Sequence, residues 1–313
     1  MDNYNLTPVT HFIPAGLSDL PEVHYPLFVV FVITYQITLV GNGAILLAIG
    51  TEKKLCTPTY YFLDNLSLLD ILCPSAIIPK MLDNLLTGNH SISFLGCALQ
   101  LYFPVALTGT EVFLLTVMAY DRYVAICFPL HYTLIMTKGH CAQLAAGTWA
   151  TGFLNSLLHT VSTFQLYFCK SKRVNQYYCD ITQLVALSCS STYMAEMLVF
   201  IVGGILAISA FLITIISYIY IISTILKIQS VEGKQKALST CASRLLVVCL
   251  FYGTAIFTYI RPSSSDHSPD RDRLIAMLYG VIIPMLNPMI YRLRNTEVKG
   301  ALGRVLCHRP CLH

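Results

Sequence analysis

Long apolar stretches separated by short polar segments dominate the chain, and each has the length of a membrane-spanning helix. A helix needs about 20 mostly apolar residues to cross the hydrocarbon layer of a bilayer, which is about 30 Å thick. The stretches cover residues 26–50, 58–82, 97–119, 139–169, 197–226, 245–260 and 274–291, and a more polar segment, 237–244, extends the sixth. The pattern predicts an all-α membrane protein built as a bundle of seven transmembrane helices.

Composition excludes an ordinary water-soluble domain. Of the 313 residues, 55% are hydrophobic and only 12% are charged, and the mean hydropathy is +0.64. Soluble domains are about 25% charged, and an aqueous core could not hide so much apolar surface. We therefore expect most of this surface to face lipid.

Positive charge is distributed unevenly between the two sides that seven spans define. The side that includes the C-terminus holds 13 of the 20 Lys and Arg residues but only 5 of the 16 Asp and Glu residues. Because cytoplasmic loops are rich in Lys and Arg, we expect an extracellular N-terminus and a cytoplasmic C-terminus. Residues 1–25 show no cleavable signal peptide, so the first span is expected to direct insertion.

This orientation divides the chain into an extracellular tail (1–25), the seven-helix domain (26–294) and a cytoplasmic segment (295–313). In the last segment, the apolar residues between 298 and 306 are spaced as on one face of a helix, which predicts a short amphipathic helix on the inner leaflet. In the tail, Asn5 begins the sequence Asn-Leu-Thr and is an acceptor for glycosylation.

Two acids, Asp70 and Glu111, lie near the middle of the second and third spans. Ionisable groups in mid-membrane are costly and are read as functional by default. Two facing carboxylates cannot both stay ionised without a cation or a proton between them. We therefore predict a sodium or proton site at this pair, with Asn42 and Asn287 nearby. The alternative is a pair of neutral acids that only fixes helix packing.

A charged pair closes the third span at its cytoplasmic end. Asp121 can hold Arg122, which Tyr123 follows, in a resting state and release it towards a partner. The alternative is an arginine that merely extends to the membrane interface, which is frequent.

The last span carries a motif that loosens a helix. Pro288 removes a backbone donor, Asn287 can satisfy the freed backbone groups, and Tyr291 lies on the same face as Asn287 at i+4. This arrangement predicts a hinge, with a static kink as the alternative.

Together these motifs resemble those of odorant receptors, a family of seven-helix receptors that couple to G proteins. The matching motifs are Met-Ala-Tyr-Asp-Arg-Tyr (118–123) with its continuation to 132, the second-span stretch 58–70, Lys-Ala-Leu-Ser-Thr-Cys-Ala-Ser (236–243), Phe-Tyr-Gly-Thr (251–254) and Pro-Met-Leu-Asn-Pro-Met-Ile-Tyr (284–291). Thr59 and Tyr60 replace the usual Met-Tyr, and Arg244 stands where the family usually has His. The sixth span has Tyr252 in place of the Trp of other rhodopsin-like receptors, which favours odorant receptors.

What the resemblance implies is signalling triggered by a ligand at the plasma membrane of sensory cilia. An odorant binds, the cytoplasmic end of helix six swings out, a stimulatory olfactory G protein docks near Arg122, and cyclic AMP rises. Tyr218 and Tyr291 would steady Arg122 in the active state, and Arg244 and Tyr252 belong to the same switch. Membrane lipid and a trafficking chaperone are further expected partners, and neither a cofactor nor nucleic acid is expected.

Four of the twelve cysteines fall on the extracellular side, where disulfides persist. Four cysteines allow three pairings. The resemblance favours Cys97 with Cys179 and Cys169 with Cys189, and Cys97 with Cys189 is the alternative. A bridge from Cys97 would hold the loop 170–195 over the mouth of the bundle.

The expected ligand pocket lies in the outer half of the bundle, one to two helical turns above Glu111. Its lining residues are Pro104, Val105, Thr108, Val202, Gly203, Leu206, Ala255, Ile256, Tyr259, Met277 and Gly280. The lining is mainly apolar, with the hydroxyls of Thr108 and Tyr259 to orient the ligand. Because no acid or base is among these positions, we expect a small, mostly neutral ligand.

Other classes of membrane protein fit less well. A transporter or channel is disfavoured by the odd number of spans, the missing repeats and the lack of a polar pore lining. No zinc-protease, nucleophile-elbow or phosphate-loop motif is present in the sequence, which argues against an enzyme.

Overall fold

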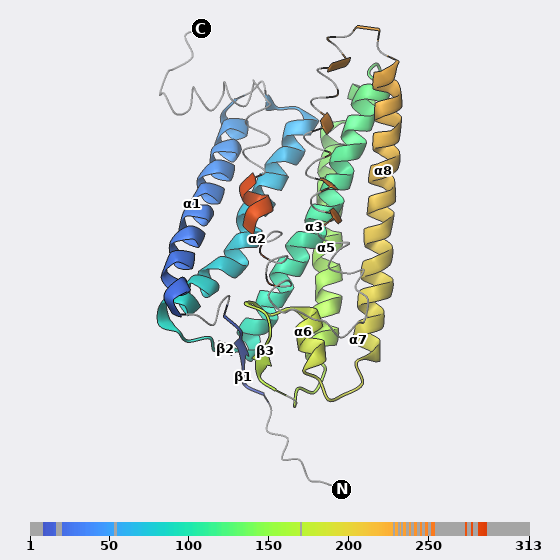
Figure 1. Ribbon diagram of the computed structural model, residues 1–313. Helices are drawn as coiled ribbons and strands as arrows, with labels where there is room; N and C mark the ends of the chain where they lie inside the picture. The colour runs from blue at the N-terminus through green and yellow to red at the C-terminus, as the bar shows by residue number, and fades with distance from the viewer. Residues whose placement is uncertain are drawn as a thin grey trace.

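Five long helices lie side by side in a bundle (Figure 1). They are α1 (Pro21–Thr51), α2 (Pro58–Thr87), α3 (Phe94–Cys127), α5 (Lys138–Phe164) and α8 (Gly204–Leu226). The computed structural model describes residues 9–16, 21–52, 55–169, 171–227, 229–230, 232, 234–235, 238, 241–242, 245, 248–249, 252–253, 273, 277 and 281–286. Described positions of the sixth and seventh spans are helical as well.

Short elements connect the long helices. They are the helices α4 (Tyr132–Ile135), α6 (Ile181–Ala186) and α7 (Tyr193–Leu198), and the π-helix η2 (Val199–Gly203), which joins α7 to α8 without a break. The fourth span is shorter than the sequence predicts. We expected it to reach residue 169, but α5 ends at Phe164, because Phe168 pairs with Ser188 in a β-bridge and Cys169 is tied to Cys189.

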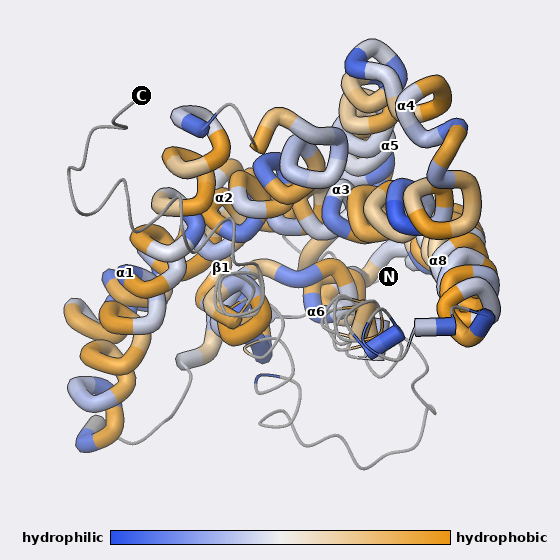
Figure 2. The backbone as a smooth tube through the Cα atoms, turned by 90° about the horizontal axis from the view of Figure 1, so that it is seen from above, coloured by the Kyte–Doolittle hydropathy of each residue, from blue (hydrophilic) through white to orange (hydrophobic). Residues whose placement is uncertain are grey.

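Apolar surface covers the outside of the bundle. Four described segments are long and apolar enough to cross a membrane: Glu22–Thr51, Pro58–Thr87, Phe94–Cys127 and Tyr193–Leu226. Along α8, Ile205, Ile208 and Ile219 are all more than half exposed, and Figure 2 shows apolar residues, in orange, on the outlying helices α1 and α8. So much exposed apolar surface is typical of contact with lipid.

Helix α3 is the centre of the bundle, because it packs against α2, α5 and α8. Its approach to α5 is closest at Gly152, where a Cβ atom would lie only 2.6 Å from the carbonyl oxygen of Ala106 and 2.6 Å from the amide nitrogen of Thr110. One turn further, the Ser156 hydroxyl donates a hydrogen bond to the carbonyl oxygen of Tyr102 (2.6 Å). The glycine therefore permits a helix contact that no larger residue would allow.

A small sheet lies at one end of the bundle. Strand β1 (His11–Pro14) pairs antiparallel with β2 (Ile92–Ser93) and parallel with β3 (Arg173–Val174), so β1 is the middle strand. Phe12 of β1 is fully buried against Cys97, Cys179 and Phe168. The sequence did not predict this sheet, since residues 1–25 were expected to form only a tail.

Two disulfides lie beside the sheet. Cys97 bonds to Cys179 with a Cα–Cα distance of 5.5 Å, and Cys169 bonds to Cys189 with a Cα–Cα distance of 5.9 Å. These are the pairs that the sequence analysis preferred, and the alternative Cys97–Cys189 bond is not formed. We call this end of the bundle the disulfide end and the opposite one, which carries Asp121, the Asp121 end.

Candidate functional site

The two acids of the middle of the bundle are both buried, on α2 and α3. The Cys73 side chain on α2 lies within electrostatic reach of both Asp70 and Glu111. For Oε1 of Glu111, no hydrogen-bond partner is found among the described residues. Asn42 is buried too, and its Nδ2 donates hydrogen bonds to the carbonyl oxygens of Thr38 (3.1 Å) and Pro284 (3.3 Å). Asn287, the fourth member of the predicted cation site, lies outside the described residues.

A hydrogen-bonded carboxylate occupies the Asp121 end. The side chain of Asp121 is 0% exposed, and it accepts hydrogen bonds from the Thr59 hydroxyl (2.8 Å) and the Tyr132 hydroxyl (2.7 Å). Nε of Arg122 lies 4.0 Å from Oδ2 of Asp121. Three segments, the start of α2, the end of α3 and α4, therefore meet at one buried negative charge.

The sequence indicated Asp121 and Arg122, but it did not indicate Thr59 and Tyr132 as the hydrogen-bond donors to Asp121. The sequence contained a signal for Thr59. Its hydroxyl replaces the methionine that odorant receptors usually have at this position, and a methionine side chain cannot donate a hydrogen bond. Burial raises the pKa of Tyr132, and the hydrogen bond and the negative charge of Asp121 raise it further. The Tyr132 hydroxyl therefore stays protonated and remains a donor to Asp121.

Large apolar side chains are exposed next to this carboxylate. Leu130 is 88% exposed and Leu134 is 73% exposed, in and beside α4, while Tyr132 of the same segment points to Asp121. The segment thus has one polar anchor and an open apolar surface of the kind that contacts another protein or a membrane.

Tyr252 of the sixth span is buried between α3 and α8. Its ring lies 5.1 Å from that of Phe211, and its hydroxyl is 3.5 Å from that of Thr116, which accepts a hydrogen bond from the Thr214 hydroxyl (3.2 Å). Tyr218 belongs to the same buried cluster. The ring of Tyr123 lies 5.8 Å from that of Tyr220 on α8. Of the predicted switch residues, Arg244, Asn287, Pro288 and Tyr291 lie outside the described residues.

The described residues of the predicted pocket fall on α3, η2, α8 and the seventh span, in the half of the bundle nearer the disulfide end. Pro104, Val105 and Thr108 lie on α3, and Thr108 is within hydrogen-bond reach of the Cys73 thiol on α2. Val202 and Gly203 belong to the π-helix η2, and Leu206 to the first turn of α8. Met277 packs on a buried cluster of α1 and α2 that includes Ile77 and Ile78. Ala255, Ile256, Tyr259 and Gly280 lie outside the described residues.

Two features near these positions were not predicted. The first is the π-helix itself, a rare element that is frequent at functional sites. The second is His159 on α5, which is buried and whose Nε2 would lie 3.6 Å from a Cβ atom at Gly203. Nδ1 of His159 has no hydrogen-bond partner among the described residues. The half of the bundle nearer the disulfide end therefore has a buried imidazole that the predicted lining did not include.

Comparison with known proteins gives one consistent result. A model of the olfactory receptor family matches residues 31–309. The chain is 49% identical to olfactory receptor 5B12 of Homo sapiens over 302 residues, which are 96% of each chain. It is 48% identical to olfactory receptor 5B21 of Mus musculus over 96% of this chain and 94% of the relative. It is also 48% identical to olfactory receptor 8U9 of Homo sapiens over 99% of this chain and 100% of the relative.

Proposed function

This chain belongs to the olfactory receptor family, and we propose that it binds a small, mostly neutral volatile molecule in the half of the bundle nearer the disulfide end. Members of this family are multi-pass receptors of the plasma membrane, not enzymes, and they signal through G proteins to cyclic AMP. The chain is accordingly an odorant receptor with a seven-helix bundle.

The π-helix η2 is the observation that carries this location for the ligand. The π-helix takes the place of regular α-helix at Val202 and Gly203 and leads into α8. Helix α8 packs against α3, which carries Pro104 and Val105. Single turns of π-helix of this kind are frequent at functional sites. His159, next to Gly203, would supply a hydrogen bond to a neutral polar group of the ligand. Ala255, Ile256, Tyr259, Met277 and Gly280 would complete the lining.

A panel of odorants tests this assignment. Cells that express the chain with the stimulatory olfactory G protein should raise cyclic AMP in response to neutral volatiles. Tyr259→Phe should reduce the potency of polar agonists about tenfold, since one hydrogen bond of about 1.4 kcal/mol corresponds to that factor. Tyr167→Phe, an exposed position at the disulfide end, is the matched control. Unchanged potency of every agonist with Tyr259→Phe and Tyr259→Ala would remove Tyr259 from the pocket.

The disulfide end, in this proposal, faces the outside of the cell and the Asp121 end faces the cytoplasm. Disulfides persist in oxidising compartments, and the side with more Lys and Arg is cytoplasmic. Asn5 would then carry a glycan, and residues 295–313 would lie on the inner leaflet. Sensory cilia are the proposed destination, with a trafficking chaperone to bring the receptor there.

The Asp121 end is the proposed site of G protein coupling. Asp121 restrains Arg122 at rest, and agonist binding releases Arg122 to the G protein while Leu130 and Leu134 provide apolar contact. Tyr218 and Tyr291 would stabilise the released arginine. Tyr123, Arg244, Tyr252, Asn287 and Pro288 would take part in the same movement.

Asp121→Asn is expected to raise basal cyclic AMP several-fold. The amide still accepts a hydrogen bond from Thr59 or Tyr132, but it no longer has the charge that restrains Arg122. The measurement is cyclic AMP without agonist at equal surface expression. Asp83→Asn, which removes only an exposed ion pair with Lys80 near the disulfide end, should leave it unchanged. Wild-type basal activity in the Asp121 variant would contradict the restraint.

The buried acids form the second proposed device, a sodium or proton site at Asp70 and Glu111 with Asn42 and Asn287. Asp70 and Glu111 are both buried, and a cation or a shared proton would offset the cost of two carboxylates in one low-dielectric site. Replacing sodium by an organic cation at fixed ionic strength should shift agonist potency in the wild type, and Glu111→Gln should abolish this shift. If sodium changes neither protein, the acids serve helix packing alone.

A further inference from the structure

A small cavity lies at the disulfide end, and none of the residues that line it belongs to the proposed ligand site. Its volume is about 10 Å³, and four segments that are distant in sequence enclose it. The lining residues are Ala15 and Gly16 after β1, Met81, Asn84 and Leu85 of α2, His90 before β2, and Tyr177 after β3. The cavity is therefore a junction between the N-terminal segment, a helix end and two loops.

Three polar side-chain atoms of this lining are buried without a partner in the described part of the chain. They are Oδ1 of Asn84, Nδ1 of His90 and the hydroxyl of Tyr177. The Asn84 and Tyr177 side chains are only 5% and 4% exposed. Buried polar atoms in folded proteins nearly always have a hydrogen-bond partner, either protein or water. Three such atoms around one cavity indicate a shared partner inside it.

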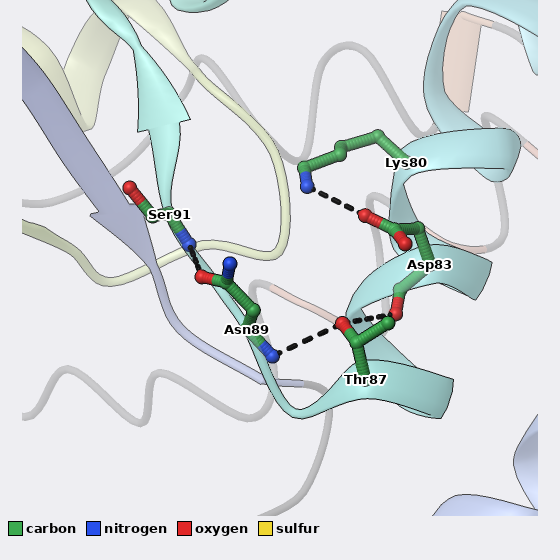
Figure 3. A network of polar contacts seen from close by, with 5 residues as sticks. All are labelled: Lys80, Asp83, Thr87, Asn89 and Ser91. Atoms are coloured by element: carbon green, nitrogen blue, oxygen red, sulfur yellow. Dashed lines mark hydrogen bonds and ion pairs between the residues drawn. The ribbon is translucent and has the colours of Figure 1, made fainter.

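The neighbours of His90 on both sides, Asn89 and Ser91, are held by hydrogen bonds, which Figure 3 shows. Nζ of Lys80 is 2.7 Å from Oδ2 of Asp83, and the Thr87 hydroxyl donates to the carbonyl oxygen of Asp83. The backbone N–H of Asn89 donates to the Thr87 hydroxyl, and that of Ser91 donates to Oδ1 of Asn89. His90 lies between these two anchored residues, so its position at the cavity is fixed by the fold.

We propose that one ordered water molecule occupies this cavity and joins Asn84, His90 and Tyr177. The water donates hydrogen bonds to Oδ1 of Asn84 and to Nδ1 of His90, and it accepts one from the Tyr177 hydroxyl. A cavity of this volume is close to the smallest that holds a water molecule, and buried waters typically make about three hydrogen bonds. Among the described residues, no cluster of His, Cys, Asp and Glu suited to a metal ion exists, and the lining of this cavity holds one histidine and no acid.

The ionisation state of His90 agrees with its role as an acceptor. Burial lowers the pKa of His90, and the nearby His24 and Lys80 lower it further. A neutral imidazole can keep its proton on Nε2 and accept at Nδ1. The proposal does not depend on the identity of the odorant or on the proposed ligand site.

The test is the melting temperature of the purified full-length receptor. Tyr177→Phe removes one partner of the water and should lower Tm by about 3 °C, because a hydrogen bond is lost and the remaining groups are left less well satisfied. Tyr167→Phe makes the same change at a 69% exposed position of the same loop and should leave Tm unchanged. If the cavity holds no shared partner, the Tyr177 hydroxyl is a buried group without a hydrogen bond. Its removal in Tyr177→Phe would then leave Tm unchanged or raise it. That result would overturn the proposal.

A second variant separates a shared water from independent effects. Asn84→Leu should also lower Tm, and the double variant should lose no more than about the larger single loss, since both changes act on one water. A double loss equal to the sum of the two would overturn the shared site. A high-resolution density map should show a peak within hydrogen-bond distance of the three atoms in the wild type, and its absence there would overturn the proposal as well.

Discussion

Replacing Gly152 with alanine is expected to remove most of the folded receptor from the cell surface and to lower its Tm by about 5 °C. The new methyl group would meet the carbonyl oxygen of Ala106 and the amide nitrogen of Thr110, each at 2.6 Å. Both atoms belong to the backbone of α3, so no side-chain rotation can relieve the contact. The two helices must move apart, and overpacking of this kind costs about 1–3 kcal/mol or more.

The same substitution at Gly147 is the control. Gly147 lies on the same helix, and a Cβ atom there would have nothing within 4 Å. Alanine is a better helix former than glycine by about 1 kcal/mol, so Gly147→Ala should be neutral or slightly stabilising. The measurements are surface staining of intact cells and Tm of purified protein. Equal behaviour of the two variants would show that the contact between α3 and α5 is not as close as described.

Arg122→Gln is expected to reduce agonist-driven nucleotide exchange on the G protein by more than tenfold. The glutamine keeps some length and polarity but loses the charge that Asp121 restrains and that the G protein would receive. A loss of only about 1.4 kcal/mol of coupling free energy already corresponds to a factor of ten. The rate of nucleotide exchange should fall, while the amount of receptor at the cell surface stays close to that of the wild type.

Arg173→Gln is the control for this experiment, because it removes an exposed arginine at the opposite end of the bundle. Nucleotide exchange is measured in membranes that contain equal amounts of receptor and purified G protein. If exchange with Arg122→Gln stays within twofold of the wild type, the proposed switch at Asp121 and Arg122 is wrong.

The long helices could be predicted from the sequence because the bilayer imposes their length and apolar character. The first three spans and the fifth coincide with helices that extend a few residues beyond the apolar stretch. Helix ends are less predictable, since they depend on local contacts. The end of α5 is set by the bridge between Phe168 and Ser188, which are 20 residues apart and share no sequence signal.

The small sheet and the π-helix could not be predicted for a related reason. Strands β2 and β3 have two residues each, too few to show an alternating pattern. Their pairing with β1 is set by the disulfide of Cys97 and by the burial of Phe12. A π-helix such as η2 has the same apolar composition as the α-helix around it, so hydropathy does not distinguish the two.

The ionisable residues of the candidate site could be predicted from the sequence because they interrupt apolar membrane spans. The neutral polar residues of the site could not. Asp121, Arg122, Asp70 and Glu111 are visible because ionisable groups are rare in membrane spans. Thr59 and Tyr132 are ordinary residues for a helix start and a loop, and only the fold brings their hydroxyls to Asp121. His159 was not among the predicted pocket residues, since nothing in the sequence places its side chain next to Gly203.

Strand β1 has a consequence for biosynthesis. It is among the first segments to leave the ribosome, yet its neighbours in the sheet are residues 92–93 and 173–174. At 5–20 residues per second, the second neighbour follows on the order of 10–30 s later. During that interval the apolar ring of Phe12 lacks the neighbours that bury it in the folded protein, and it is open to chaperones or to a neighbouring nascent chain. Closure of the sheet therefore requires that the long helices α1, α2, α3 and α5 have already been synthesised.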